Sequence, residues 1–238
     1  MKLIEEITNQ VRNTIQQEFS FSETQHIDEK VLLEEQLEAI VVVSNILFVR
    51  INHMAELIQS DGKRAAAKLF RIYRQVAQNF AAQTQAHFEI YDPCSFILIY
   101  PGSRETAKVV VKHAMHLTHI LTDSLKSYSD QFNRMDFTIG IDHGRLLGTN
   151  EGRIVWQGIC IEKAKKISEL CSKPFRIGIS GLVYSVLDES DKVVTQRILG
   201  IPKKEEIWIR NSYDFVNEHK HYYVTRHTEA YEPLNDID

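Results

Sequence analysis

Several side chains of metal-binding type occur in the sequence, but not at the spacing that metal sites use. His113, His116 and His119 lie three residues apart on a predicted helix, and this spacing carries them slowly around one side of it. No carboxylate or cysteine joins them at ligand spacing, so the pattern does not favour a metal site. The three cysteines cannot all pair with one another and show no metal-ligand spacing; they are Cys94, Cys160 and Cys171.

Two further places in the sequence carry charged side chains in a definite pattern. Glu162 and Lys166 are four residues apart on a predicted helix, which permits an ion pair between their side chains. Asp92 precedes Pro93 between two apolar runs, so a hairpin turn is expected there. Neither pattern identifies a reaction by itself, and both depend on the elements that position them.

The stretch from Met135 to Ile167 is the most strongly patterned part of the chain. Apolar and polar residues alternate from Phe137 to Asp142, as in a half-buried strand. Gly144 is expected to break this strand, the apolar run then resumes, and residues 150–152 supply the next turn. A short strand over 153–156 follows. Gly158 then opens a helix with an apolar stripe, so this stretch predicts strand, turn, strand, turn, strand and helix.

The rest of the chain adds helices and strands on both sides of this stretch. Near the N-terminus we expect an amphipathic helix over 1–20, a loop over 20–24 and a short helix over 28–37. Further helices are expected over 54–86 (with a break at Asp61-Gly62), 103–128 and 180–187. Strands are expected over 39–51, 176–179, 206–209 and 222–225, and a two-stranded hairpin over 87–100. This order predicts an α+β fold with a ferredoxin-like βαββαβ core. The apolar stripe of the first helix leaves two roles open: packing on its own domain, or forming a dimer or a signal-input helix.

Composition excludes some classes of function. The chain has 238 residues, a 43% hydrophobic share and a formal net charge of −4, so no overall basic field calls for nucleic acid. No apolar run reaches the length of a membrane span, and the first residues are acidic and amphipathic, unlike a signal peptide. We therefore expect a cytoplasmic protein with no nucleic-acid partner and no membrane span.

Two motifs of the patterned stretch resemble the catalytic domain of class III nucleotidyl cyclases, the adenylate and guanylate cyclase family. They are FTIGIDHG from Phe137 to Gly144 and GICIEKAKKI from Gly158 to Ile167. The resemblance covers roughly 38–190 and implies the cyclase type of the βαββαβ core. The residues on either side are then expected to form a helical extension over 1–37 and a second extension over 191–238 that packs on the domain. The family's reaction, cyclisation of a nucleoside triphosphate, implies two Mg²⁺ or Mn²⁺ ions held by carboxylates.

The resemblance also places the family's functional positions, and most carry other residues here. The first metal aspartate falls on Arg50 and the second on Cys94, although a shifted hairpin would bring in Asp92 instead. A guanidinium cannot bind a cation. The two base-reading positions fall on apolar side chains, the ribose-binding asparagine on an acid and the transition-state arginine on a lysine; these are Ile90, Val155, Glu162 and Lys166.

These substitutions favour a catalytically degenerate cyclase domain that needs no cofactor. We expect a homodimer in which Arg50 and Lys166 face one another across the interface and bind a nucleotide or phosphate without metal, or in which the domain binds a protein partner. In a competing interpretation Glu162 and Lys166 form a surface ion pair and Arg50 is satisfied by a nearby acid.

Two alternative functions remain open. The first is an active, divergent cyclase that acts on a nucleoside triphosphate without a purine, as in bacterial antiphage signalling, with Asp92 and Glu162 recruited to hold Mg²⁺ or Mn²⁺. The second is a purely structural interaction module whose cleft is closed by Ile90, Val155 and other side chains.

Overall fold

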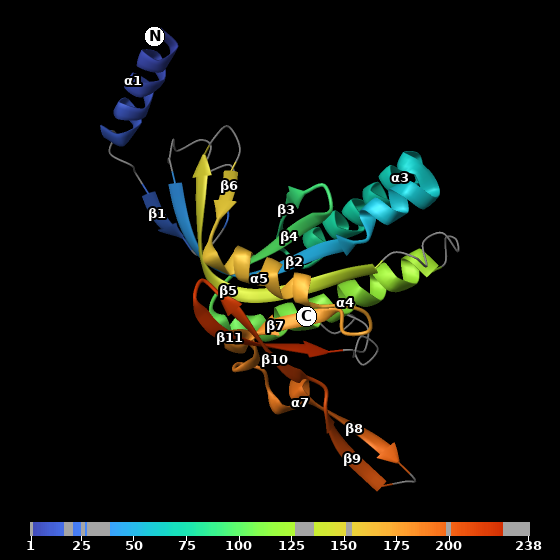
Figure 1. Ribbon diagram of the computed structural model, residues 1–238. Helices are drawn as coiled ribbons and strands as arrows, with labels where there is room; N and C mark the ends of the chain where they lie inside the picture. The colour runs from blue at the N-terminus through green and yellow to red at the C-terminus, as the bar shows by residue number, and fades with distance from the viewer. Residues whose placement is uncertain are drawn as a thin grey trace.

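A computed structural model describes residues 2–16, 21–24, 27, 39–126, 136–150, 154–198 and 201–225 (Figure 1). Within them, the main feature is a nine-stranded mixed sheet. Its continuous path runs through β10 (Ile209–Phe215), β11 (Glu218–Thr225), β7 (Ile177–Ser180), β5 (Asp136–Asn150), β2 (Ala39–Asn52), β4 (Ser95–Pro101) and β3 (His87–Asp92). Off this path, β1 (Phe21–Thr24) pairs with β2, and β6 (Ile154–Gln157) pairs with β5.

Helices cover both faces of this sheet. Side chains alternate along β2, so Leu47, Val49 and Ile51 face a core shared with α3 (Met54–Gln83) and α4 (Ala107–Lys126). Ile46 and Phe48 point to the opposite face, where they pack with residues of α5 (Ile159–Leu170) and β6. Read in chain order, β2, α3, β3, β4, α4 and β5 form the predicted βαββαβ core, and the α+β expectation is confirmed.

The strand after residue 135 is longer than the sequence suggested. Gly144 was expected to break it, but β5 runs unbroken from Asp136 to Asn150 and pairs with β2 over its whole length up to Thr149. Gly140 and Gly144 have a different role, because α5 crosses the strand so closely that there is little room for a side chain at either position. A Cβ on Gly144 would lie 3.0 Å from the Cβ of Cys160, and one on Gly140 would lie 1.9 Å from the carbonyl oxygen of Ala164.

Other expectations are corrected near the two ends of the chain. A loop was expected over 20–24, but Phe21–Thr24 form β1, which pairs in parallel with the start of β2. The strand expected over 206–209 is wrong: Glu206 ends β9 and Ile209 begins β10, whereas the one expected over 222–225 is confirmed as part of β11. The short helix expected over 28–37 lies outside the described residues.

The N-terminal helix is confirmed as α1 (Lys2–Gln16), and it stands apart from the sheet (Figure 1). Its apolar residues Ile4, Ile7 and Val11 are 70%, 51% and 52% exposed, so the stripe does not pack on the domain described here. None of the described helices combines the length and apolar character needed to cross a membrane.

The remaining elements are short. They are the 3₁₀ turn η1 (Arg104–Thr106), the helices α6 (Gly181–Tyr184) and α7 (Glu189–Lys192), and a separate two-stranded hairpin of β8 (Val193–Ile198) and β9 (Ile201–Glu206). Strand β11 joins the C-terminal part to the main sheet through its antiparallel pairing with β7.

Candidate functional site

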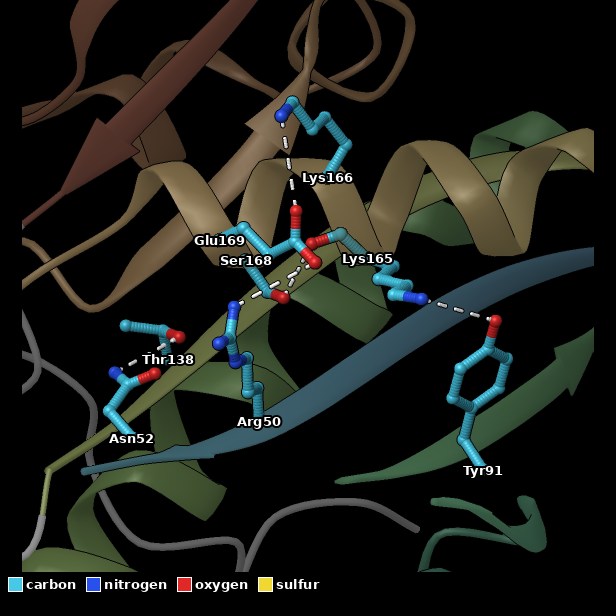
Figure 2. Close-up of polar contacts among 8 residues, drawn as sticks. All are labelled: Arg50, Asn52, Tyr91, Thr138, Lys165, Lys166, Ser168 and Glu169. Atoms are coloured by element: carbon cyan, nitrogen blue, oxygen red, sulfur yellow. Dashed lines mark hydrogen bonds and ion pairs between the residues drawn. The ribbon is translucent and has the colours of Figure 1, made fainter. Parts of the chain in front are cut away.

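Arg50 lies near the end of β2, on the face of the sheet that α5 covers. Ser95 of β4 and Thr138 of β5 are its direct partners on the two neighbouring strands. The guanidinium reaches towards α5, where its Nη1 lies 3.7 Å from Oε1 of Glu169 (Figure 2). The Arg50 side chain is 43% exposed, so this cation is accessible to solvent.

Lys166 reaches the same carboxylate from the other side. Its Nζ lies 3.9 Å from Oε2 of Glu169, one helical turn further along α5. Within this chain Arg50 and Lys166 both contact Glu169 (Figure 2), and their facing one another across a subunit interface stays a prediction. Glu169 was not among the predicted site residues, although its position three residues after Lys166 on a predicted helix favours an ion pair.

Glu162 makes a different contact from the one its spacing suggested. Its Oε1 accepts a hydrogen bond of 3.0 Å from the Tyr91 hydroxyl, whereas Lys166 pairs with Glu169. Lys165 also approaches Tyr91, with its ammonium 5.0 Å from the ring centroid. Burial raises the pKa of Tyr91, and the hydrogen bond to Glu162 raises it further. This cluster joins the hairpin strand β3 to the outer side of α5.

A local irregularity in β3 explains why Tyr91 was overlooked. Ile90 pairs with Phe96 and Asp92 with Ser95, so the register shifts between them and Tyr91 has no direct partner. The Tyr91 ring packs edge-on against Phe48, which lies on the face that α5 covers. Tyr91 therefore contacts Glu162, one of the predicted site residues. Ile90, which the resemblance assigned to base reading, does not line the groove next to α5.

Asp92 and Cys94 hold the hairpin turn together. Oδ1 of Asp92 accepts a hydrogen bond of 2.7 Å from the backbone N–H of Cys94, and the Cys94 carbonyl accepts one of 2.8 Å from Ile51. The turn is thereby fixed beside the end of β2 that carries Arg50. Burial, and after it the nearby Asp92 carboxylate, raises the pKa of the Cys94 thiol, which keeps it protonated at neutral pH.

These residues do not fit the pair of metal ions that the cyclase fold implies. At the two positions where the resemblance puts the metal ligands, Arg50 would repel a cation and Cys94 carries a protonated thiol, while Asp92 accepts a hydrogen bond from the turn amide. Among the residues that the structure describes, no three His, Cys, Asp or Glu side chains come together as a metal site. His113 in particular is buried between the rings of Phe80 and Tyr100.

A groove of about 960 Å³ lies beside this cluster. Tyr91 and Glu162 line it, together with Glu23, Val41, Arg145, Leu146, Leu147, Trp156, Gln157, Gly158, Ile159 and Ile161. Val155, the second expected base-reading position, is half-buried in β6 and does not line the groove. Its neighbour Trp156 does, and the Trp156 indole donates a hydrogen bond of 3.1 Å to Nε2 of His87. Neither Ile90 nor Val155, which were expected to close the cleft of a purely structural module, is among the residues that line this groove.

Comparisons with known proteins identify the fold. No protein-family profile matches the sequence, and no curated protein matches it either. Among solved structures, a bacterial light-regulated adenylyl cyclase aligns with a TM-score of 0.66 and 12% identity, over 97% of this chain and 65% of that one.

Two further solved structures are similar over most of the chain. A class III adenylyl cyclase-like ATP-binding protein from Pseudomonas aeruginosa aligns with a TM-score of 0.60 and 13% identity, over 74% of this chain and 41% of that one. A non-canonical dimeric guanylyl cyclase domain from the fungus Blastocladiella emersonii aligns with a TM-score of 0.58 and 14% identity, over 79% and 96%. With its βαββαβ core and these neighbours, the chain has the fold of the class III nucleotidyl cyclase catalytic domain, in a strongly divergent form.

Proposed function

We propose that this chain is a catalytically degenerate cyclase-type domain that binds a nucleotide or phosphate ligand without metal and acts in regulation. The observation that carries the proposal is the convergence of Arg50 and Lys166 on one carboxylate, in the place where the cyclase fold implies metal ions. Two cations share a single negative charge there, so one positive charge remains for a ligand. Charge-assisted hydrogen bonds to phosphate are among the stronger polar contacts in proteins.

The similar structures support the nucleotide part of this proposal. One of them is described as a cyclase-like ATP-binding protein, and the others as adenylyl or guanylyl cyclases. Because the sequence identities to these structures are low, the similarity indicates only the fold. The ligand of this chain must therefore be inferred from its own residues. The base would lie in the groove beside Tyr91 and Glu162, the only acid of α5 that touches Tyr91 in the described contacts.

We also infer that the domain works as a homodimer. The fungal neighbour is described as dimeric. In this chain α1 exposes the apolar stripe of Ile4, Ile7 and Val11, and Leu147 and Ile159 beside the groove are 38% and 58% exposed. Covering such apolar area stabilises association. Light scattering of the full chain would measure the mass in solution, and a monomer at micromolar concentration would contradict the inference.

Calorimetric titration with ATP, GTP, CTP and UTP tests the proposed binding. We expect at least one to bind, and Arg50→Gln to weaken that binding about tenfold, or about 1.4 kcal/mol. Lys108→Gln is the matched control, because it removes a half-exposed cation from an ion pair with Asp188, away from the site. Equal weakening by both variants would show that the loss of net charge alone is responsible.

A turnover assay separates this proposal from an active cyclase. The chain would be incubated with each triphosphate and Mg²⁺ or Mn²⁺, and products would be read by mass spectrometry. We expect no cyclic mononucleotide from any of them. A cyclic product that disappears in Asp92→Ala would overturn the degenerate assignment and make Asp92 a recruited metal ligand.

A further inference from the structure

Glu169 is the charged residue of the site that the family resemblance did not assign. Each of its two carboxylate oxygens contacts a different cation, Oε1 towards Arg50 and Oε2 towards Lys166 (Figure 2). Both contacts are long for ion pairs, at 3.7 and 3.9 Å, and the Glu169 side chain is 33% exposed. The carboxylate therefore bridges the two cations loosely and in contact with water.

The position of Glu169 on α5 offers no reason of its own for a negative charge. The helix ends at Leu170, so Glu169 lies in the last turn, where the helix dipole favours cations and disfavours anions. The charge of Glu169 is thus kept in place by Arg50 and Lys166 rather than by the helix. For the same reason, replacing Glu169 by a neutral residue should not weaken the helix.

We propose that Glu169 is an internal anion that selects the ligand of this site, admitting di- and triphosphate chains and excluding single phosphate groups. The inference rests on the proposed function, because it concerns the same two cations. A ligand must displace the Glu169 carboxylate before it can contact both Arg50 and Lys166. Glu169 is thereby a specificity-determining residue rather than a group that touches the ligand.

The selectivity follows from charge and reach. A single phosphate group that replaces the carboxylate exchanges one small anion for another and gains little, because the carboxylate competes from within the chain at high effective concentration. A polyphosphate chain carries more charge and more acceptor oxygens, so separate phosphate groups engage the two cations at once. The carbonyl end of α5 adds negative potential at the same place, so the side chains must supply all of the attraction.

Binding of metal-free phosphates to four versions of the full chain, the wild type and three variants, tests this inference. The ligands are orthophosphate, pyrophosphate and tripolyphosphate, measured by calorimetry in EDTA. In the wild type we expect tripolyphosphate to bind at least about 100-fold more tightly than orthophosphate. In Glu169→Gln we expect orthophosphate to bind about tenfold more tightly than in the wild type, so that the difference between the ligands shrinks.

Glu189→Gln is the matched control. Glu189 pairs with Lys192 at the same spacing of three residues on α7, with 3.5 Å between the charged atoms, so the variant makes the same change in charge elsewhere. We expect it to bind like the wild type. Thermal unfolding checks that the variants fold, and Glu169→Asp is a second variant that keeps the charge but shortens its reach. It should bind orthophosphate with an affinity between those of the wild type and Glu169→Gln.

The possible outcomes separate the two claims. If tripolyphosphate binds the wild type, and Glu169→Gln leaves both affinities unchanged, the selector role of Glu169 is overturned and the phosphate site stands. If none of the three phosphates binds the wild type or Glu169→Gln, the inference and the proposed phosphate site both fail. If Glu189→Gln tightens orthophosphate binding as much as Glu169→Gln does, net charge explains the effect and the inference is wrong.

Discussion

The Tyr91 hydroxyl donates a hydrogen bond of 3.0 Å to Oε1 of Glu162, and this contact ties the hairpin of β3 and β4 to the outer side of α5. Both residues line the groove where we place the base of the ligand. Two side chains contact the tyrosine ring: the Phe48 ring in a T-shaped arrangement, 5.1 Å away between centroids, and the ammonium of Lys165. Tyr91 is therefore held in the groove wall by its hydrogen bond to Glu162 and by the packing of its ring on Phe48. Mutations can remove the hydrogen bond alone or both contacts together.

Tyr91→Phe removes the hydrogen bond but keeps the ring. We expect it to lower the free energy of unfolding by about 0.5–1.5 kcal/mol, the usual range for one hydrogen bond. Tyr91→Ala also removes the packing on Phe48 and should cost about 2 kcal/mol in total, because the contact between the two rings is lost as well. Urea unfolding measures both values. Equal losses in the two variants would mean that the ring contributes nothing to the wall.

His113 should make the stability of the domain depend on pH. Burial between α3, β4 and α4, with a smaller effect of His116, lowers the pKa of His113 from 6.5 to about 4. The unfolded chain therefore takes up a proton between these values while the folded chain does not, so stability falls as the pH drops from about 6.5 to 4. The contribution lost is on the order of 3 kcal/mol.

Unfolding free energies measured across this pH range, for the wild type and for His113→Leu, check the prediction. The leucine variant has no group to titrate, so its curve should be flatter over the same interval. Nδ1 of His113 is buried without a partner among the described residues, so its removal should not break a hydrogen bond. Parallel curves for the two proteins would contradict the assignment of the pH effect to His113.

Gly140 should tolerate no side chain, because α5 crosses β5 at this residue. A Cβ would lie 1.9 Å from the Ala164 carbonyl oxygen and 2.7 Å from the Ser168 nitrogen, both backbone atoms that cannot turn aside. We expect Gly140→Ala to lower stability by about 3 kcal/mol or more, or to prevent folding. At Gly181, by contrast, the nearest atom would be 3.5 Å away, so Gly181→Ala serves as the control. Thermal unfolding that shifts equally in both would argue against a close crossing.

Local patterns were enough to predict the core of the fold. The β-branched run at 39–51 and the alternation at 137–142 predicted the two central strands, and helices were expected over 54–86, over 103–128 and after Gly158, where α3, α4 and α5 lie. The prediction failed at Gly144, where glycine was taken as a strand breaker. Its actual role depends on a helix that packs across the strand, and one sequence segment does not carry that information. The strand at 21–24 failed similarly, since its partner β2 lies 18 residues away by register, with Phe21 opposite Ala39.

The site was predicted in part. Placing Arg50 and Lys166 by family resemblance named two residues that contact one carboxylate, but it did not name Glu169, because that position carries no role in the resemblance. Tyr91 was missed for a geometric reason. The register shift in β3 changes which residue faces α5, and counting along the sequence assumes that no such shift occurs.

The most direct test of the central claim is the effect of metal removal on nucleotide binding. The affinity of the tightest-binding triphosphate would be measured with Mg²⁺ and again in EDTA. If Arg50 and Lys166 hold the phosphates, binding in EDTA should be as tight or tighter, because Mg²⁺ neutralises part of the triphosphate charge that the cations attract. Binding that requires Mg²⁺ or Mn²⁺ and vanishes in EDTA would contradict the account and return the site to metal-dependent chemistry.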